Sequence, residues 1–73
     1  LLPAGVVSAG GTFERGDVVQ VIGPDGRHLA SGTANYAVGD VARIRGQRSD
    51  QIAVVLGYEY GDEVIHRSNL VLL

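Results

Sequence analysis

The chain has 73 residues, which suffices for one domain, and it contains no cysteine, which excludes a disulfide framework and a thiolate zinc site. Its formal net charge is −2, which argues against a protein that binds nucleic acid mainly through bulk positive charge. All six basic residues are arginine. Its apolar runs are too short to cross a bilayer, which argues against a membrane partner.

The first part of the chain predicts a strand and a turn. Eleven glycines divide the sequence into short segments, a pattern that favours short strands over long helices. Residues 5–9 are predicted to form the first strand, which Gly10 and Gly11 end. Phe13 is the only phenylalanine and is expected in the core, and residues 14–17 predict a turn into the next strand.

The clearest local signal is a β-hairpin with strands over residues 18–22 and 27–34. The residues between these strands suit a type I turn followed by a left-handed residue, and they are Pro24, Asp25 and Gly26. Gly32 lies inside the second strand, where a glycine predicts a bulge or the close approach of another backbone.

The pattern of apolar residues changes after the hairpin and predicts a helix. Val38, Val41 and Ile44 recur at every third position, as on one face of a short helix, and Gly46 is a suitable end. Gly39 weakens this helix by about 1 kcal/mol relative to alanine.

A second helix is predicted from Ser49, the expected N-cap, to Gly57, with Asp50 in its first turn where the helix dipole favours negative charge. Two more strands are expected over residues 63–67 and 70–73. The chain is therefore predicted to be mainly β with two short helices. About five to six short strands favour a small, closed or nearly closed pseudo-barrel, because closure removes exposed strand edges.

The sequence offers little catalytic or metal-binding chemistry. His28 and His66 each stand next to an arginine, and no third ligand follows at local spacing, so we expect no metal site. The carboxylates suit turns and caps better than paired acid–base work, which needs a cleft. From these residues alone we predict no catalytic residue and no enzyme activity in this segment.

Three arginines and three tyrosines leave alternatives open. Arg43, Arg45 and Arg48 fall within a six-residue span at the end of the first predicted helix. They form either a solvated helix end, where cations complement the dipole, or a contact patch for RNA phosphate or an acidic partner. The tyrosines offer either stacking rings for bases or cover for a small core, and they are Tyr36, Tyr58 and Tyr60.

The hairpin resembles the signature of PUA domains, small pseudo-barrels found in pseudouridine synthases and archaeosine transglycosylases. That resemblance is carried by GDVVQV, DGR and LASG within residues 16–32. Across essentially the whole chain, the sequence also resembles the C-terminal PUA domain of bacterial glutamate 5-kinases. The segments that carry this resemblance are LLPAGVV at 1–7, FERGDVV at 13–19, NY at 35–36, IRG at 44–46, LGY at 56–58 and, above all, EVIHRSNLVL at 63–72.

The resemblance implies that residues 1–73 are a PUA domain cut from a longer chain, with an amino-acid-kinase domain N-terminal to it. In that family the kinase domain binds ATP, Mg²⁺ and glutamate and transfers the γ-phosphoryl group to the glutamate side-chain carboxylate, the first step of proline synthesis. By the same resemblance the 73 residues bind no cofactor, and the parent enzyme is a cytoplasmic homo-oligomer.

Two functions follow as hypotheses. The first is a non-catalytic, regulatory or structural appendage that contacts the kinase domain, which the negative net charge favours. The second is an RNA-binding module, because in RNA-modifying PUA relatives RNA docks along a groove near the turn before the hairpin and the last strands. The candidate residues for contact with RNA or a protein partner are Arg15, Gly16, Arg43, Arg45, Arg48, His66 and Arg67.

Overall fold

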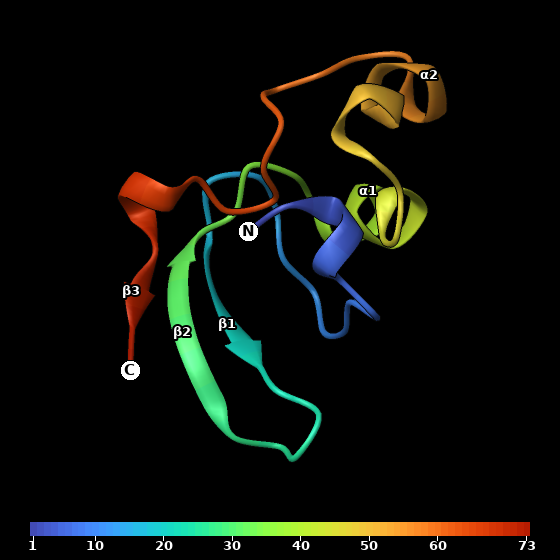
Figure 1. Ribbon diagram of the computed structural model, residues 1–73. Helices are drawn as coiled ribbons and strands as arrows, with labels where there is room; N and C mark the ends of the chain where they lie inside the picture. Colours follow the sequence, from blue (N-terminus) through green and yellow to red (C-terminus); the bar gives the residue numbers. More distant parts are fainter.

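A three-stranded antiparallel sheet and two short helices make up the fold in the computed structural model, which describes residues 1–73 (Figure 1). The elements in chain order are the 3-10 turn η1 (Pro3–Gly5), strands β1 (Val18–Ile22) and β2 (His28–Thr33), helix α1 (Val38–Ile44), the 3-10 turn η2 (Ser49–Gln51), helix α2 (Ile52–Leu56), the 3-10 turn η3 (Arg67–Asn69) and strand β3 (Val71–Leu72). Neither helix has the length and hydrophobicity that a membrane-spanning helix requires.

The predicted hairpin is confirmed. Strand β1 pairs antiparallel with β2, and the register shifts by one residue between Val21 and Ile22. The turn residue Gly26 has a φ of 82°, which a glycine adopts without steric cost, and its N–H donates to the Gly23 carbonyl at 3.0 Å. In Figure 1 the hairpin extends away from the two helices, and β3 lies along the other edge of β2.

Both predicted helices are also confirmed, although the start of the second differs from the prediction. Gly57 has a left-handed φ of 84° and ends α2 as expected. Ser49, however, does not cap α2, because it opens the separate 3-10 turn η2, and the residue before α2 is Gln51, which makes no side-chain cap hydrogen bond. The chain therefore enters α2 through an extra turn of tighter helix.

Two of the predicted strands are absent. Residues 5–9 form no strand, because η1 ends within them and residues 6–12 make no backbone hydrogen bond to β1. Residues 63–67 contribute only an isolated bridge between Ala34 and Ile65, after which the chain turns into η3. The Ser68 N–H donates to His66 Nδ1 at 3.1 Å, which favours this turn over a longer strand. The sheet therefore has three strands where five to six were predicted.

A seam of hydrogen bonds joins the sheet to the C-terminal part of the chain, and we define it as residues 34–36 together with residues 61–65. The Asn35 N–H donates to the Val64 carbonyl at 2.8 Å, and the Asn35 side-chain amide donates to the Glu63 carbonyl at 3.0 Å. The Val64 N–H in turn donates to the Leu1 carbonyl at 2.7 Å. The seam therefore ties the start, the middle and the end of the chain together.

The core is formed by the two helices and the seam, and the strands add to it only partly buried residues such as Val19 and Val21. It is one cluster of seven buried residues, namely Tyr36, Val41, Ile44, Ile52, Leu56, Val64 and Ile65. The predicted core residue Phe13 is half-buried and packs against this cluster from the loop before β1. Helix α1 contributes Val41 and Ile44, two of the residues whose threefold spacing predicted it, because that spacing places them on one face.

Gly32 marks the close approach that its position in the sequence predicted. A Cβ atom at this position would lie 2.6 Å from both the Asn69 carbonyl oxygen and Ile65 Cγ2. The bulge lies elsewhere, between Val21 and Ile22. Gly32 therefore allows the backbone before β3 to pack directly on β2.

Replacing Gly32 by alanine should reduce the free energy of unfolding by about 1–3 kcal/mol, because the added methyl group overpacks a site closed by backbone atoms. The matched control is Gly39→Ala in α1, where a Cβ meets nothing within 4 Å. This control should raise stability by about 0.4–1 kcal/mol. Urea unfolding monitored by circular dichroism measures both changes, and equal stability of Gly32→Ala and the parent chain would contradict the packing described.

Candidate functional site

Ala34 connects the two chain segments that hold four of the predicted contact residues. Its carbonyl accepts a hydrogen bond from the Gly16 N–H at 2.8 Å, and its own N–H donates to the Asp17 carbonyl at 2.8 Å. Ala34 also forms the bridge to Ile65, the residue before His66. The structure therefore brings the turn at residues 14–17 and the segment at 65–67 to the same end of the sheet.

The turn before β1 holds Arg15 against an aromatic ring. The Glu14 N–H donates to the Asp17 carboxylate at 2.9 Å, which closes the turn. The Arg15 guanidinium carbon lies 4.0 Å from the centroid of the Tyr60 ring, within the range of a cation–π contact. Arg15 thus lies on the protein surface, and one face of its guanidinium is in contact with the Tyr60 ring.

His66 and Arg67 lie at the start of η3. His66 Nδ1 accepts the Ser68 N–H, and its Nε2 lies 3.8 Å from the nearer Glu63 carboxylate oxygen. The other Glu63 oxygen lies 3.4 Å from the Leu1 amino nitrogen. Arg67 is exposed and has no ion-pair partner within the chain, so it is the member of this group whose charge is most available to a ligand.

The three clustered arginines point to three different partners. Arg43 Nη2 donates to the Val55 carbonyl at 2.6 Å and so links α1 to α2. Arg45 Nη1 donates to the Val7 carbonyl at 2.8 Å and holds the loop after η1. These two side chains act as ties within the fold, since each guanidinium bonds a carbonyl that regular secondary structure leaves free.

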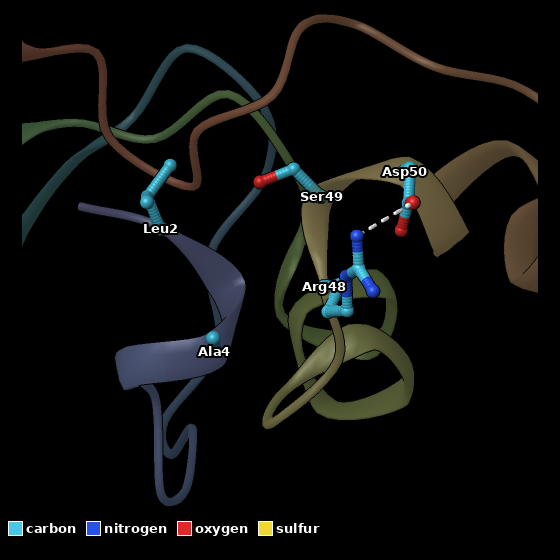
Figure 2. Close-up of a pocket in the computed structure, with 5 residues that line it drawn as sticks. All are labelled: Leu2, Ala4, Arg48, Ser49 and Asp50. Carbon is cyan, nitrogen blue, oxygen red and sulfur yellow. Dashed lines mark ion pairs between the residues drawn. The ribbon is translucent and has the colours of Figure 1, made fainter.

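Arg48 lines a shallow pocket of about 360 Å³ together with Leu2, Ala4, Ser49 and Asp50, which Figure 2 shows. Its guanidinium pairs with the Asp50 carboxylate at 3.3 Å, and both side chains are largely exposed. Exposed ion pairs of this kind contribute little to stability. The pairing leaves little net charge in the pocket, so the pocket has no strong preference for an anion.

The tyrosines form a linked network rather than a row of free rings. Tyr36 is fully buried, its hydroxyl donates to the Gly61 carbonyl at 2.6 Å, and it accepts the Tyr60 N–H at 2.8 Å. The Tyr60 ring lies 5.6 Å from that of Tyr36 and 5.4 Å from that of Tyr58. The sequence left open whether the tyrosine rings stack on bases or cover the core. The structure places Tyr36 in the core, while Tyr58 and Tyr60 are partly exposed.

Two tyrosine hydroxyls have altered acidity. Burial raises the pKa of Tyr36 above its ordinary value, and the hydrogen bond from the Tyr60 N–H offsets part of this rise. The hydrogen bond that the Tyr58 hydroxyl donates to the Asp40 carboxylate at 2.5 Å raises the pKa of Tyr58. Both hydroxyls therefore stay protonated at neutral pH and act as donors.

The largest concavity is an apolar groove that the sequence did not predict. It has a volume of about 990 Å³ and lies between residues 5–13 and strand β1, with Val41, Val64 and Ile65 also in its lining. We call it the β1 groove. The sequence held one indication of this groove, which is the composition of β1, VVQVI. A nearly continuous apolar run is typical of a strand that is covered on both faces.

The ionisable residues do not form a metal centre. No three histidine, aspartate or glutamate side chains converge to hold a metal ion.

Comparison with known proteins places the chain in a family. The PUA domain family matches residues 1–56. The chain is 52% identical over all 73 residues to a glutamate 5-kinase of Geobacter sulfurreducens and 51% identical over 72 residues to one of Syntrophotalea carbinolica. A glutamate 5-kinase of Shewanella woodyi is 49% identical over 73 residues.

This chain belongs to the PUA domain family. Its similarity to glutamate 5-kinases covers 100% of its own length but only 20% of the Geobacter sulfurreducens protein, in the C-terminal part. The chain thus spans about one fifth of the length of the curated relatives it matches. The alignment with the Syntrophotalea carbinolica protein covers 99% of this chain and 19% of that protein. The resemblance predicted from the sequence is confirmed.

Replacing Tyr36 by phenylalanine tests the tyrosine network. The folded state holds the Tyr36 proton more tightly than the unfolded chain does, so the protonated hydroxyl stabilises the fold. This contribution to the free energy of unfolding is fully present below a pH of about 10, the ordinary tyrosine pKa. It is lost as the pH rises through the raised pKa of the folded state. Tyr36→Phe should lower the free energy of unfolding at pH 7 by about 1–3 kcal/mol, since the Gly61 carbonyl and the Tyr60 N–H lose their partner.

The same variant should show a smaller loss of stability between pH 9 and 11 than the parent chain, as measured by urea unfolding at each pH. Tyr60→Phe is the control, because it keeps the Tyr36 hydroxyl and both of its hydrogen bonds. An alkaline decrease in Tyr36→Phe as steep as that of Tyr60→Phe would contradict the role given to Tyr36.

Proposed function

We propose that residues 1–73 are the non-catalytic C-terminal PUA domain of a glutamate 5-kinase. The observation that carries the proposal is the match of the entire chain, at about half identity, to only one fifth of such enzymes. In this proposal the remaining part of the enzyme contains the amino-acid-kinase domain, binds ATP, Mg²⁺ and glutamate, and forms glutamyl 5-phosphate. The full enzyme is proposed to be a homo-oligomer in the cytoplasm.

The domain is proposed to act by contact with the rest of the enzyme, and its surface supports this role. Several large hydrophobic side chains are exposed, which is typical of a surface that meets another protein surface. They concentrate on the hairpin and the C-terminal strand, and include Val18, Ile22, Leu29, Val71, Leu72 and Leu73. Contacts of this kind would allow the domain to influence the stability, assembly or regulation of the kinase.

We also propose that the sheet belongs to the fuller pseudo-barrel expected of the family. Residues 63–65 support this, because they are hydrogen-bonded to both Leu1 and Asn35, which are distant in sequence. Bonding to two separate chain segments is typical of an extended segment inside a sheet, and Ile65 also forms a bridge with Ala34.

Deleting residues 1–73 from the full-length enzyme tests the proposed role. We expect the truncated enzyme to retain phosphoryl transfer to glutamate but to change in oligomeric state, in inhibition by proline or in dependence on Mg²⁺. Size-exclusion chromatography with light scattering and steady-state kinetics measure these properties. If all three stayed the same, the regulatory and structural role would be wrong, and if the isolated 73 residues phosphorylated glutamate, the non-catalytic assignment would be wrong.

RNA binding is a second candidate, supported by one observation. The turn with Arg15 and Gly16 and the segment with His66 and Arg67 meet at Ala34, so two basic groups lie at one end of the sheet. Acidic residues stand close by in the same segments, among them Glu14, Asp17 and Glu63. These carboxylates and the net charge of −2 weaken the attraction for phosphate.

Titration of the ¹⁵N-labelled domain with a structured RNA hairpin should therefore give amide shifts at low salt that disappear near physiological salt, as nonspecific charge pairing does. A DNA hairpin of the same sequence is the control and should behave alike. Shifts confined to residues 15–16 and 66–67 that persist at the higher salt with RNA alone would instead establish RNA recognition.

A further inference from the structure

The loop that follows α2 presents two tyrosine rings to solvent. We define it as residues 57–61 and call it the tyrosine loop. It begins at Gly57 and ends at Gly61, and both glycines have a positive φ. Tyr58 is 41% exposed and Tyr60 is 46% exposed. In Figure 1 the loop crosses the end of the molecule that lies opposite the hairpin turn, so its rings face a different side from the apolar residues of the hairpin.

Several contacts hold the tyrosine loop in one conformation. Its backbone is bonded twice to the Tyr36 hydroxyl, through the Tyr60 N–H at 2.8 Å and through a carbonyl at 2.6 Å. The Tyr58 hydroxyl donates to the Asp40 carboxylate at 2.5 Å, which fixes the second ring. Aromatic side chains that are already fixed lose little conformational entropy on binding, and tyrosine and arginine are enriched among the residues that dominate protein–protein contacts. The exposed rings are therefore preorganised for a contact.

The charge beside the two rings is negative. Glu59 lies between the two tyrosines in sequence, and Asp62 follows the loop directly. Both carboxylates are exposed, and neither forms an ion pair within the chain. Besides burial, their negative charges raise the pKa of Tyr36, which shows that both lie close to the tyrosine network. A partner at this surface therefore meets two carboxylates that lack a counter-charge.

One of the two rings already binds a cation, and the other does not. The Arg15 guanidinium carbon lies 4.0 Å from the centroid of the Tyr60 ring, whereas no cationic side chain lies over the Tyr58 ring. Arg43 is the nearest cation to Tyr58, but its guanidinium is bonded to the Val55 carbonyl at 2.6 Å. An aromatic ring beside unpaired carboxylates attracts a cation through the ring quadrupole and through direct charge attraction. Tyr58 is therefore complementary to an arginine or lysine side chain.

We propose that the tyrosine loop binds a basic segment of a separate protein, with an arginine or lysine side chain of that protein against the Tyr58 ring. Glu59 and Asp62 supply the complementary charge. The choice of a separate protein rests on the proposed function, because the surface proposed to meet the rest of the enzyme lies on the hairpin and the C-terminal strand, away from the tyrosine loop (Figure 1).

The charges favour a basic protein segment over RNA at this surface. Tyrosine rings also stack on nucleic acid bases, so the rings alone would suit either partner. The phosphates of RNA, however, would approach the unpaired carboxylates of Glu59 and Asp62, which repel them. An arginine or lysine side chain gains from the rings and from the carboxylates together.

Fluorescence anisotropy with the full-length protein tests the proposal. The probe is a fluorescein-labelled glycine peptide that carries two arginines, and the control is the same peptide with citrulline, which has the shape of arginine without its charge. Near physiological salt we expect the arginine peptide to bind about threefold or more tighter than the citrulline peptide, in keeping with a cation–π contact. Equal binding of the two peptides would overturn the proposal, as would displacement of the arginine peptide by an RNA hairpin.

Variants of the full-length protein locate the bound peptide. Tyr58→Leu keeps an apolar side chain but removes the ring, so it should weaken binding of the arginine peptide about threefold or more. Tyr58→Phe keeps the ring and should bind within about twofold of the parent protein. Urea unfolding of both variants shows whether the fold is retained. Equal affinities of Tyr58→Leu and Tyr58→Phe would overturn the proposal.

A matched pair of charge variants gives a second readout that leaves the rings untouched. Glu59→Gln removes one exposed carboxylate beside Tyr58 and should weaken binding of the arginine peptide by about twofold. Asp25→Asn removes one exposed carboxylate in the hairpin turn, at the other end of the molecule, and should leave binding unchanged. If both variants weakened binding equally, the attraction would come from net charge alone, and the site would be wrong.

Discussion

The fold depends on the hydrogen-bonded seam between residues 34–36 and 61–65. Ala34 takes part in bonds to the turn before β1, Asn35 bonds Val64 through its backbone, and the Tyr36 hydroxyl bonds Gly61. Leu1 joins the same seam through Ile65 and Val64. In a chain with so few buried residues, these bonds supply the long-range connections that a larger hydrophobic core would otherwise provide.

The seam also explains how the charged residues are used. It carries the turn with Arg15 and the segment with His66 and Arg67 to one end of the sheet. The other arginines serve the fold itself, since Arg43 fastens α2 and Arg45 fastens the loop after η1. A basic cluster in the sequence thus becomes a set of internal ties, which is consistent with a domain that acts through protein contacts more than through phosphate binding.

The two ends of the domain differ in how well they are covered. At the helical end Ile44 and Ile52 are completely buried, and the tyrosine network closes over the core. Along β1 the lining is apolar and open, and the backbone edge has no partner. Exposed strand edges are normally blocked or paired, so this half of the domain is the less completely covered one.

Local sequence determined the hairpin, its turn and the two helices, because Pro24 and Gly26 fix turn geometry and the spacing of Val38, Val41 and Ile44 fixes a helical face. It also placed the chain in its family, through motifs spread over its whole length. Only the tertiary structure decided which extended segments pair, because a β-strand requires backbone hydrogen bonds to a neighbouring segment that can be distant in sequence. Residues 5–9 lack one in this fold, and residues 63–65 find theirs in Leu1 and Asn35, which are distant in sequence. The β1 groove is likewise a product of that pairing, since a strand edge becomes visible as open only when its neighbours are known.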